Sequence, residues 1–100
     1  MILISYDIED DRLRLKISKR LHFYGLHRIQ YSVFMGTLAN KDVPKLKTDL
    51  MAFSQQKAWA PQDTILILPV HDRMKNAIEI LGQTPPTWPE IAGELHTLML

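Results

Sequence analysis

The first eight residues, MILISYDI, are almost entirely apolar, and the three acids EDD follow them at once. An apolar run of this length that stops at a polar cluster is typical of a buried strand, here ending near Asp7. Asp10 or Asp11 then supplies the short acidic side chain that favours a helix N-terminus. A buried strand that leads directly into a helix predicts a sheet with a helical layer packed against it.

The segment after these acids has the apolar spacing of an amphipathic helix. Leu13, Ile17, Leu21 and Tyr24 recur at intervals of four, four and three, so they share one face. The alternation in RLRLKI could also indicate a strand, but the acidic cap and the length of the pattern favour a helix that ends at Gly25. The bases fall on a different face: Arg12, Lys16, Lys19 and Arg20.

Three further elements are expected. HRIQYSVFMGTL, residues 27–38, predicts one bent strand or two short strands meeting near residues 30–32. Asn40 or Asp42, with Pro44, opens a second helix. TILILPV, residues 64–70, predicts a strand covered on both faces, with Pro69 marking its end or an edge. The buried stripe of the second helix is Val43, Leu46, Leu50 and Phe53.

If residues 27–38 form a hairpin, the order is the β-α-β-β-α-β arrangement of an α+β, ferredoxin-like fold with both helices on one face of the sheet. AIEILG, residues 77–82, could add an edge strand within the chain or on a partner's sheet. We therefore expect a ferredoxin-like domain over residues 1–82 and a tail over 83–100. A capping box at residues 87–90 predicts a short helix in that tail.

Composition narrows the class of protein. The 100 residues contain no cysteine, so disulfides, thiol nucleophiles and zinc–thiolate sites are excluded. No apolar stretch reaches the roughly 20 residues that cross a bilayer, so we expect a cytoplasmic protein without membrane contact. The net charge of +1 conceals a run of six Lys or Arg with no acid between Arg12 and Arg28. Such a run indicates either a surface for a polyanion such as nucleic acid or a solvated helix face.

Residues 6–38, YDIEDDRLRLKISKRLHFYGLHRIQYSVFMGTL, resemble the small CRISPR-associated protein two family. The likeness lies in Tyr-Asp-Ile, a spaced Asp, Arg and Lys, then Tyr-Gly and Arg-Ile-Gln-Tyr-Ser-Val-Phe with a following Gly. The resemblance implies a ferredoxin-like homodimer that acts as a metal-dependent nuclease and as an adaptor in spacer acquisition. It also implies partnership with the CRISPR integrase, the adaptation protein one.

Carried over by residue, the resemblance makes Asp7 the metal-binding and catalytic acid, with Tyr6 beside it. The phosphate-contacting bases and the neighbours that share their cleft would be Arg14, Lys16, Arg28, Ser32 and Phe34. Arg12 and Lys19 complete the basic face on which we expect duplex DNA, with single-stranded RNA as a further ligand. Lys16 stands where some members carry Arg, which would turn a bidentate phosphate contact into a point charge.

The chemistry can also be argued from the residues. Mg²⁺ or Mn²⁺ needs few protein carboxylates where a substrate phosphate and water supply other ligands, so one Asp7 from each chain of a dimer could suffice. Asp7 could instead be a structural acid that shapes the turn into the helix. The sequence thus predicts a CRISPR adaptation protein with metal-dependent endonuclease activity on RNA or DNA. The alternative is a toxin-type (VapD-like) ribonuclease of ferredoxin-like fold. An acylphosphatase-like enzyme lacks its expected N-terminal phosphate loop with Arg, because the first base is Arg12.

Overall fold

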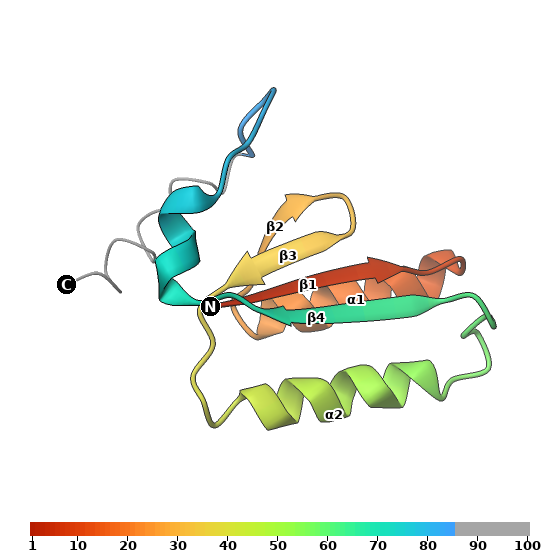
Figure 1. Ribbon diagram of the computed structural model, residues 1–100. Coiled ribbons are helices and arrows are strands. Elements are labelled where there is room, and N and C mark those ends of the chain that lie inside the picture. The colour runs from red at the N-terminus through yellow and green to blue at the C-terminus, as the bar shows by residue number, and fades with distance from the viewer. Residues whose placement is uncertain (86–100) are drawn as a thin grey trace.

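The computed structural model of the chain describes residues 1–85, and the helix expected in the tail lies outside them. The predicted order of strands and helices is confirmed, and a short 3-10 helix, η1, follows the last strand (Figure 1). The elements are β1 (Ile2–Asp7), α1 (Asp11–Phe23), β2 (His27–Gln30), β3 (Val33–Gly36), α2 (Val43–Ser54), β4 (Thr64–Pro69) and η1 (Asp72–Ala77). No helix within residues 1–85 has the length and apolar character needed to cross a membrane.

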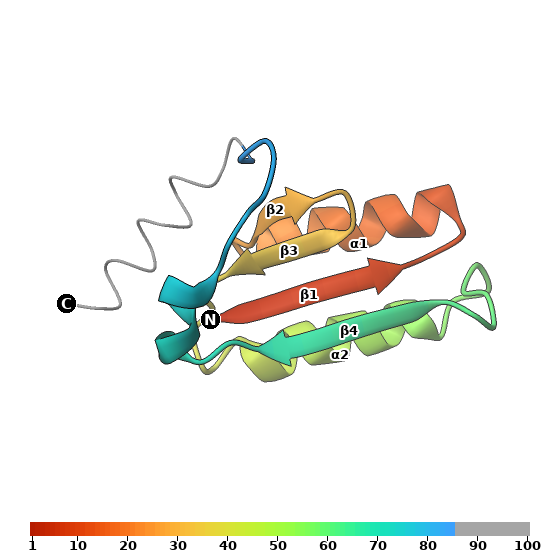
Figure 2. The same ribbon diagram turned by 45° about the horizontal axis from the view of Figure 1, so that its top comes forward.

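The four strands form one antiparallel sheet in the order β2-β3-β1-β4. Both helices lie on the same face of this sheet, as Figure 2 shows. Successive side chains of β1 point to opposite faces, so Ile2, Ile4 and Tyr6 are buried beneath the helices whereas Asp7 is exposed. The sheet therefore has one face covered by helices and one that faces away from them.

Helix α1 begins and ends as its sequence predicts. The Asp10 side chain accepts a hydrogen bond from the Leu13 amide at 2.8 Å, which satisfies one amide of the first turn. After Tyr24, Gly25 takes a φ of 82°, a left-handed conformation that costs glycine little. The predicted stripe faces the sheet, because Leu13, Ile17 and Leu21 are buried.

The segment between the helices is a hairpin of two short strands, β2 and β3, joined at Tyr31 and Ser32. The turn is tied to the central strand, because the Tyr6 amide donates to the Ser32 carbonyl at 3.0 Å. The pairing of β2 with β3 shifts register between Arg28 and Gln30. These contacts fix the turn beside the end of β1.

The core lies between the sheet and the helices. Fully buried side chains meet from β1, β3, α1 and α2, which is the two-layer packing that the apolar patterns predict. The largest of them are Phe34, Ile4, Leu13, Ile17, Leu21, Leu26, Met35 and Leu46. A further link joins the two helices, since the Tyr24 hydroxyl donates to Asp49 at 2.6 Å.

Two expectations about the last part of the domain are corrected. Strand β4 is not covered on both faces in the single chain, because Leu66 and Leu68 are 57% and 49% exposed. It lies at an edge of the sheet and ends at Pro69, as the proline predicts. Residues 77–82 form no strand within the chain, because η1 carries the backbone away from the sheet edge. Pairing of this segment with a partner's sheet stays a prediction.

Candidate functional site

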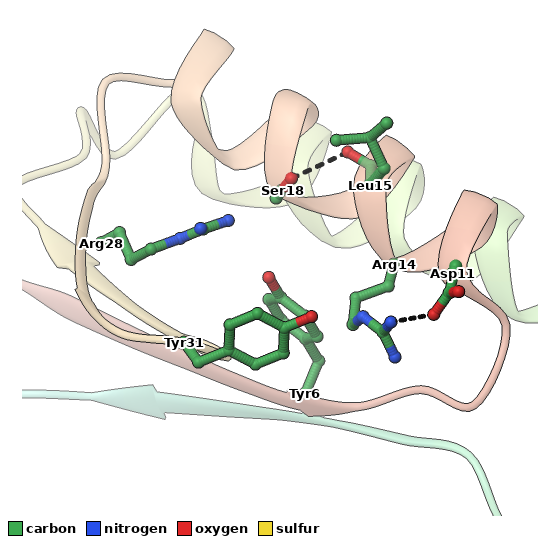
Figure 3. Close-up of a pocket in the computed structure, with 7 residues that line it drawn as sticks. All are labelled: Tyr6, Asp11, Arg14, Leu15, Ser18, Arg28 and Tyr31. Atoms are coloured by element: carbon green, nitrogen blue, oxygen red, sulfur yellow. Dashed lines mark hydrogen bonds and ion pairs between the residues drawn. The ribbon is translucent and has the colours of Figure 1, made fainter.

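A hollow of about 390 Å³ lies between α1 and the β2–β3 turn, at the end of β1 (Figure 3). We call it the two-arginine pocket, because guanidinium groups reach it from two elements. The lining residues are Tyr6, Asp11, Arg14, Leu15, Ser18, Arg28 and Tyr31. Their convergence follows from the fold: β1 presents Tyr6, one flank of α1 presents four side chains, and the hairpin supplies the rest.

Arg14 is held in place by its own segment of the chain. Its guanidinium donates to the Ile8 carbonyl at 2.8 Å and forms an ion pair with Asp11, one helical turn earlier. The Arg14 side chain is 25% exposed and that of Asp11 is 89% exposed, so solvent reaches the pair mainly from the acid's side. This anchoring fixes the position of one positive charge before any ligand arrives.

Tyr31, in the hairpin turn, lies between the two arginines. The guanidinium carbons of Arg14 and Arg28 are 5.6 and 6.0 Å from the centre of its ring, within the range of cation–π attraction. Arg28 also lies over the Phe34 ring at 5.2 Å. Figure 3 shows the rings of Tyr6 and Tyr31 between the two guanidinium groups. The pocket thus combines two cations with two phenols.

The charge of the pocket suits an anion. Two guanidinium groups face one carboxylate, and planar guanidinium groups bind phosphate oxygens with paired hydrogen bonds. The pKa of Tyr6 is raised, chiefly because burial disfavours its phenolate, although the positive charge of Arg28 opposes this effect. The Tyr6 phenol therefore stays protonated at neutral pH, where it can donate a hydrogen bond but cannot act as a base.

Asp7 lies outside this pocket. It follows Tyr6 directly in β1, and neighbouring strand residues point to opposite faces, so its exposed carboxylate lies on the face that the helices do not cover. Its partner across the sheet is Thr64. Within residues 1–85, no group of three or more His, Asp or Glu side chains is arranged to hold a metal ion. A metal site at Asp7 would therefore need ligands from outside the single chain, and the metal role of Asp7 stays a prediction.

The other predicted site residues are distributed around the molecule. Arg12 lines a separate hollow with Glu9 and Asp10, whereas Lys16 and Lys19 line a groove on the α2 side of α1. The basic residues therefore do not form one continuous face with Arg14 and Arg28. Residues 12, 16 and 19 share one side of the helix, and residue 14 lies about 160–200° around the axis from them.

Two predicted residues support the pocket rather than line it. Ser32 contributes its backbone carbonyl, which holds the hairpin turn against Tyr6. Phe34 is fully buried, and its ring lies beneath Arg28.

Sequence reasoning did not select four of the lining residues: Asp11, Leu15, Ser18 and Tyr31. The spacing of Asp11, Arg14 and Ser18 by three and four residues was a usable signal, because it places them on one helix flank. Tyr31 could be assigned only once the hairpin turn was located.

Comparisons with known proteins assign the chain to a family. A sequence model described as CRISPR associated protein Cas2 matches residues 1–78, which is most of the chain. The chain belongs to the Cas2 family. It is 36% identical over 72 residues to a protein of Korarchaeum cryptofilum named CRISPR-associated endoribonuclease Cas2, which covers 72% of this chain and 73% of that protein. A Synechocystis relative with the corresponding name is 34% identical over 89 residues and covers 89% of this chain and 91% of the relative.

Solved structures agree with the Cas2-family assignment. A hypothetical protein from Thermus thermophilus superposes with a TM-score of 0.65 at 30% identity, covering 84% of this chain and 92% of that one. Cas2 of Streptococcus pyogenes gives the same TM-score at 22% identity, covering 81% of this chain and 98% of that one, and this likeness supports the fold alone. The family resemblance expected from residues 6–38 is confirmed.

Proposed function

We propose that this Cas2-family chain is a CRISPR adaptation protein, a nucleic-acid-binding homodimer of ferredoxin-like fold that bridges the integrase and cleaves phosphodiester bonds in RNA or DNA. Curated relatives named as endoribonucleases support nuclease chemistry. The single observation that carries the proposal is the opposite orientation of Tyr6 and Asp7. One strand end presents a phenol to a two-arginine pocket and a carboxylate to an open sheet face.

The open face supports dimerisation at Asp7. Leu66 and Leu68 are exposed on β4, and their partners Ser5 and Leu3 point to the same face of β1 as Asp7. Apolar side chains in such a patch favour burial against another protein surface. A second copy packed on this face would place two strand-end carboxylates near a common axis, where their repulsion favours a bound cation.

The donor set fits a hard divalent cation only in such a dimer. Mg²⁺ prefers oxygen ligands and retains several waters, so two carboxylates and a substrate phosphate would complete its shell. The bound metal would supply Lewis-acid stabilisation of the phosphodiester. In our proposal, Arg14 and Arg28 hold the nucleic-acid backbone, and the protonated Tyr6 donates a hydrogen bond to a phosphate oxygen.

Asp7→Asn is the test, because it keeps the size of the side chain and removes its charge. The variant should dimerise and melt like the parent but lose Mg²⁺- or Mn²⁺-dependent cleavage of RNA and DNA, while binding of duplex DNA persists. Glu9→Gln, a nearby exposed acid, is the matched control and should retain cleavage. Metal-dependent cleavage by Asp7→Asn at the parental rate would remove Asp7 from the proposed site. A lower melting temperature with intact cleavage would make it a structural turn acid.

The adaptor role is separable in the same experiment. Spacer integration with the cognate integrase should be measured for the parent and for Asp7→Asn. Retained integration with lost cleavage would make the adaptor role primary, whereas loss of both would tie integration to the metal. Arg14→Ala with Arg28→Ala should weaken nucleic-acid binding in both assays. It should also flatten the salt dependence by about 0.9 per lost duplex contact.

A further inference from the structure

A second basic surface lies on the α2 side of α1. It is a groove of about 400 Å³ between the helices, and we call it the α1–α2 groove. The residues that line it are Lys16, Lys19, Arg20, Phe23 and Phe53. The four α1 residues recur at intervals of three, one and three, so they lie along one side of the helix over about 10 Å. The groove belongs to a different flank of α1 from the two-arginine pocket.

Phe23 is the unusual member of this surface. Its side chain is 75% exposed, although Phe is among the residues that most often lie inside a protein. The Arg20 guanidinium lies over its ring at 5.4 Å, and the neighbouring Tyr24 ring meets it edge-on at 5.5 Å. These contacts hold the ring in place at the surface. The ring adds nothing to the core, so its exposed face is available for a ligand.

The charges of the groove select a polyanion. Lys16 and Lys19 are exposed and form no ion pair with the described residues. Arg20 lies 3.8 Å from Asp49, whose carboxylate also accepts the Tyr24 hydroxyl. One acid therefore faces three cations, and the two lysines carry the excess positive charge.

We propose that the α1–α2 groove binds a single-stranded segment of nucleic acid, with Phe23 stacked on an unpaired base and Lys16 and Lys19 on flanking phosphates. A basic groove with an exposed aromatic ring is the arrangement that binds single strands without sequence preference. A duplex could engage the lysines, but its bases are already stacked and would not use the ring. This inference takes nucleic acid as the polyanion from the proposed function, and it requires neither cleavage nor Asp7.

The experiment measures binding of a labelled 20-nucleotide oligo(U) to the full chain by fluorescence anisotropy. EDTA is present, so that metal-dependent cleavage does not contribute. Phe23→Leu keeps an apolar side chain but removes the ring, and it should weaken binding about tenfold, as expected for loss of one stacked base. Phe23→Tyr restores a ring and should bind within about twofold of the parent. A blunt duplex of the same length should respond to neither variant.

The lysines have a charge-matched control. Lys16→Ala with Lys19→Ala should reduce the slope of log affinity against log salt by about 1.4, because each single-strand phosphate contact contributes about 0.7. Lys41→Ala with Lys57→Ala removes the same charge from exposed positions elsewhere and should change the slope much less.

Oligo(U) binding that is the same for Phe23→Leu and the parent would overturn the inference. An equal effect on the duplex, or a loss confined to binding of the integrase, would also overturn it. Repeating the series with Arg14→Ala and Arg28→Ala present separates the two surfaces. If the Phe23 effect persists there, the groove binds independently of the pocket. Failure of the Asp7 experiment would leave this result unchanged.

Discussion

Asp63 joins two loops that are 54 positions apart in the sequence. It is only 6% exposed, and its carboxylate accepts the Glu9 amide at 3.0 Å and the Ala60 amide at 2.8 Å. We expect Asp63→Ala to lower the free energy of unfolding by about 2 kcal/mol or more, because two amides would lose their acceptor. Urea unfolding measures this change. Asp42→Ala is the control: Asp42 caps α2 without a side-chain hydrogen bond, so a loss as large as that of Asp63→Ala would contradict this explanation.

Tyr24 should make stability depend on pH in the alkaline range. Its hydrogen bond to Asp49 raises the pKa of the phenol, with burial adding to the effect. The folded state therefore holds this proton more tightly than the unfolded state, so the stabilisation is complete below about pH 10 and is lost as pH rises through the raised pKa. Thermal melts of Tyr24→Phe should show a shallower decline above pH 10 than the parent. Parallel declines would contradict this assignment, and Tyr6→Phe should remove a separate part because burial also raises the pKa of Tyr6.

At the scale of single elements, the helices could be predicted far better than the site. The buried stripe and the caps of α1 follow from local spacing, because Asp10, Leu13 and Gly25 act within one or two turns of one another. The location of the hairpin turn depends on the Tyr6 amide donating to Ser32, a contact between distant segments. No local pattern contains that information, so Tyr31 was not selected.

Helix α1 also shows why the basic residues were grouped incorrectly. Six Lys or Arg in sequence read as one positive face, but a helix turns by about 100° at each residue, so neighbouring bases are divided between its flanks. Arg14 belongs to the hairpin side, whereas Lys16 and Lys19 belong to the α2 side. The prediction identified which bases are present, and the partners of each flank assigned them to separate surfaces.

For the whole molecule, the open face of the sheet is the feature that a single chain leaves incomplete. TILILPV reads as a strand covered on both faces, yet in the chain only the side of Ile65 and Ile67 packs against the core. A second copy on the opposite side would resolve the mismatch between sequence and structure. The sequence pattern then describes the strand in an assembly rather than in the isolated chain.

The final prediction tests this assembly. Leu66→Asp places a charge at a side chain that is 57% exposed in the chain, so each chain should still fold, but burial of that charge against a partner would be costly. Sedimentation velocity should give the parent twice the 11.6 kDa chain mass and Leu66→Asp the monomer mass at micromolar concentration. Met51→Asp, at a 63% exposed position of α2, is the matched control and should remain dimeric.

Leu81→Asp separates the two ways in which a partner could bind. Leu81 is 93% exposed and belongs to the segment expected to pair with a partner's sheet. If Leu81→Asp dissociates the dimer and Leu66→Asp does not, the interface is formed by residues 77–82 rather than by the sheet face. A parent that sediments as a stable monomer would contradict the homodimer. It would also leave each Asp7 without the second carboxylate that its proposed metal site requires.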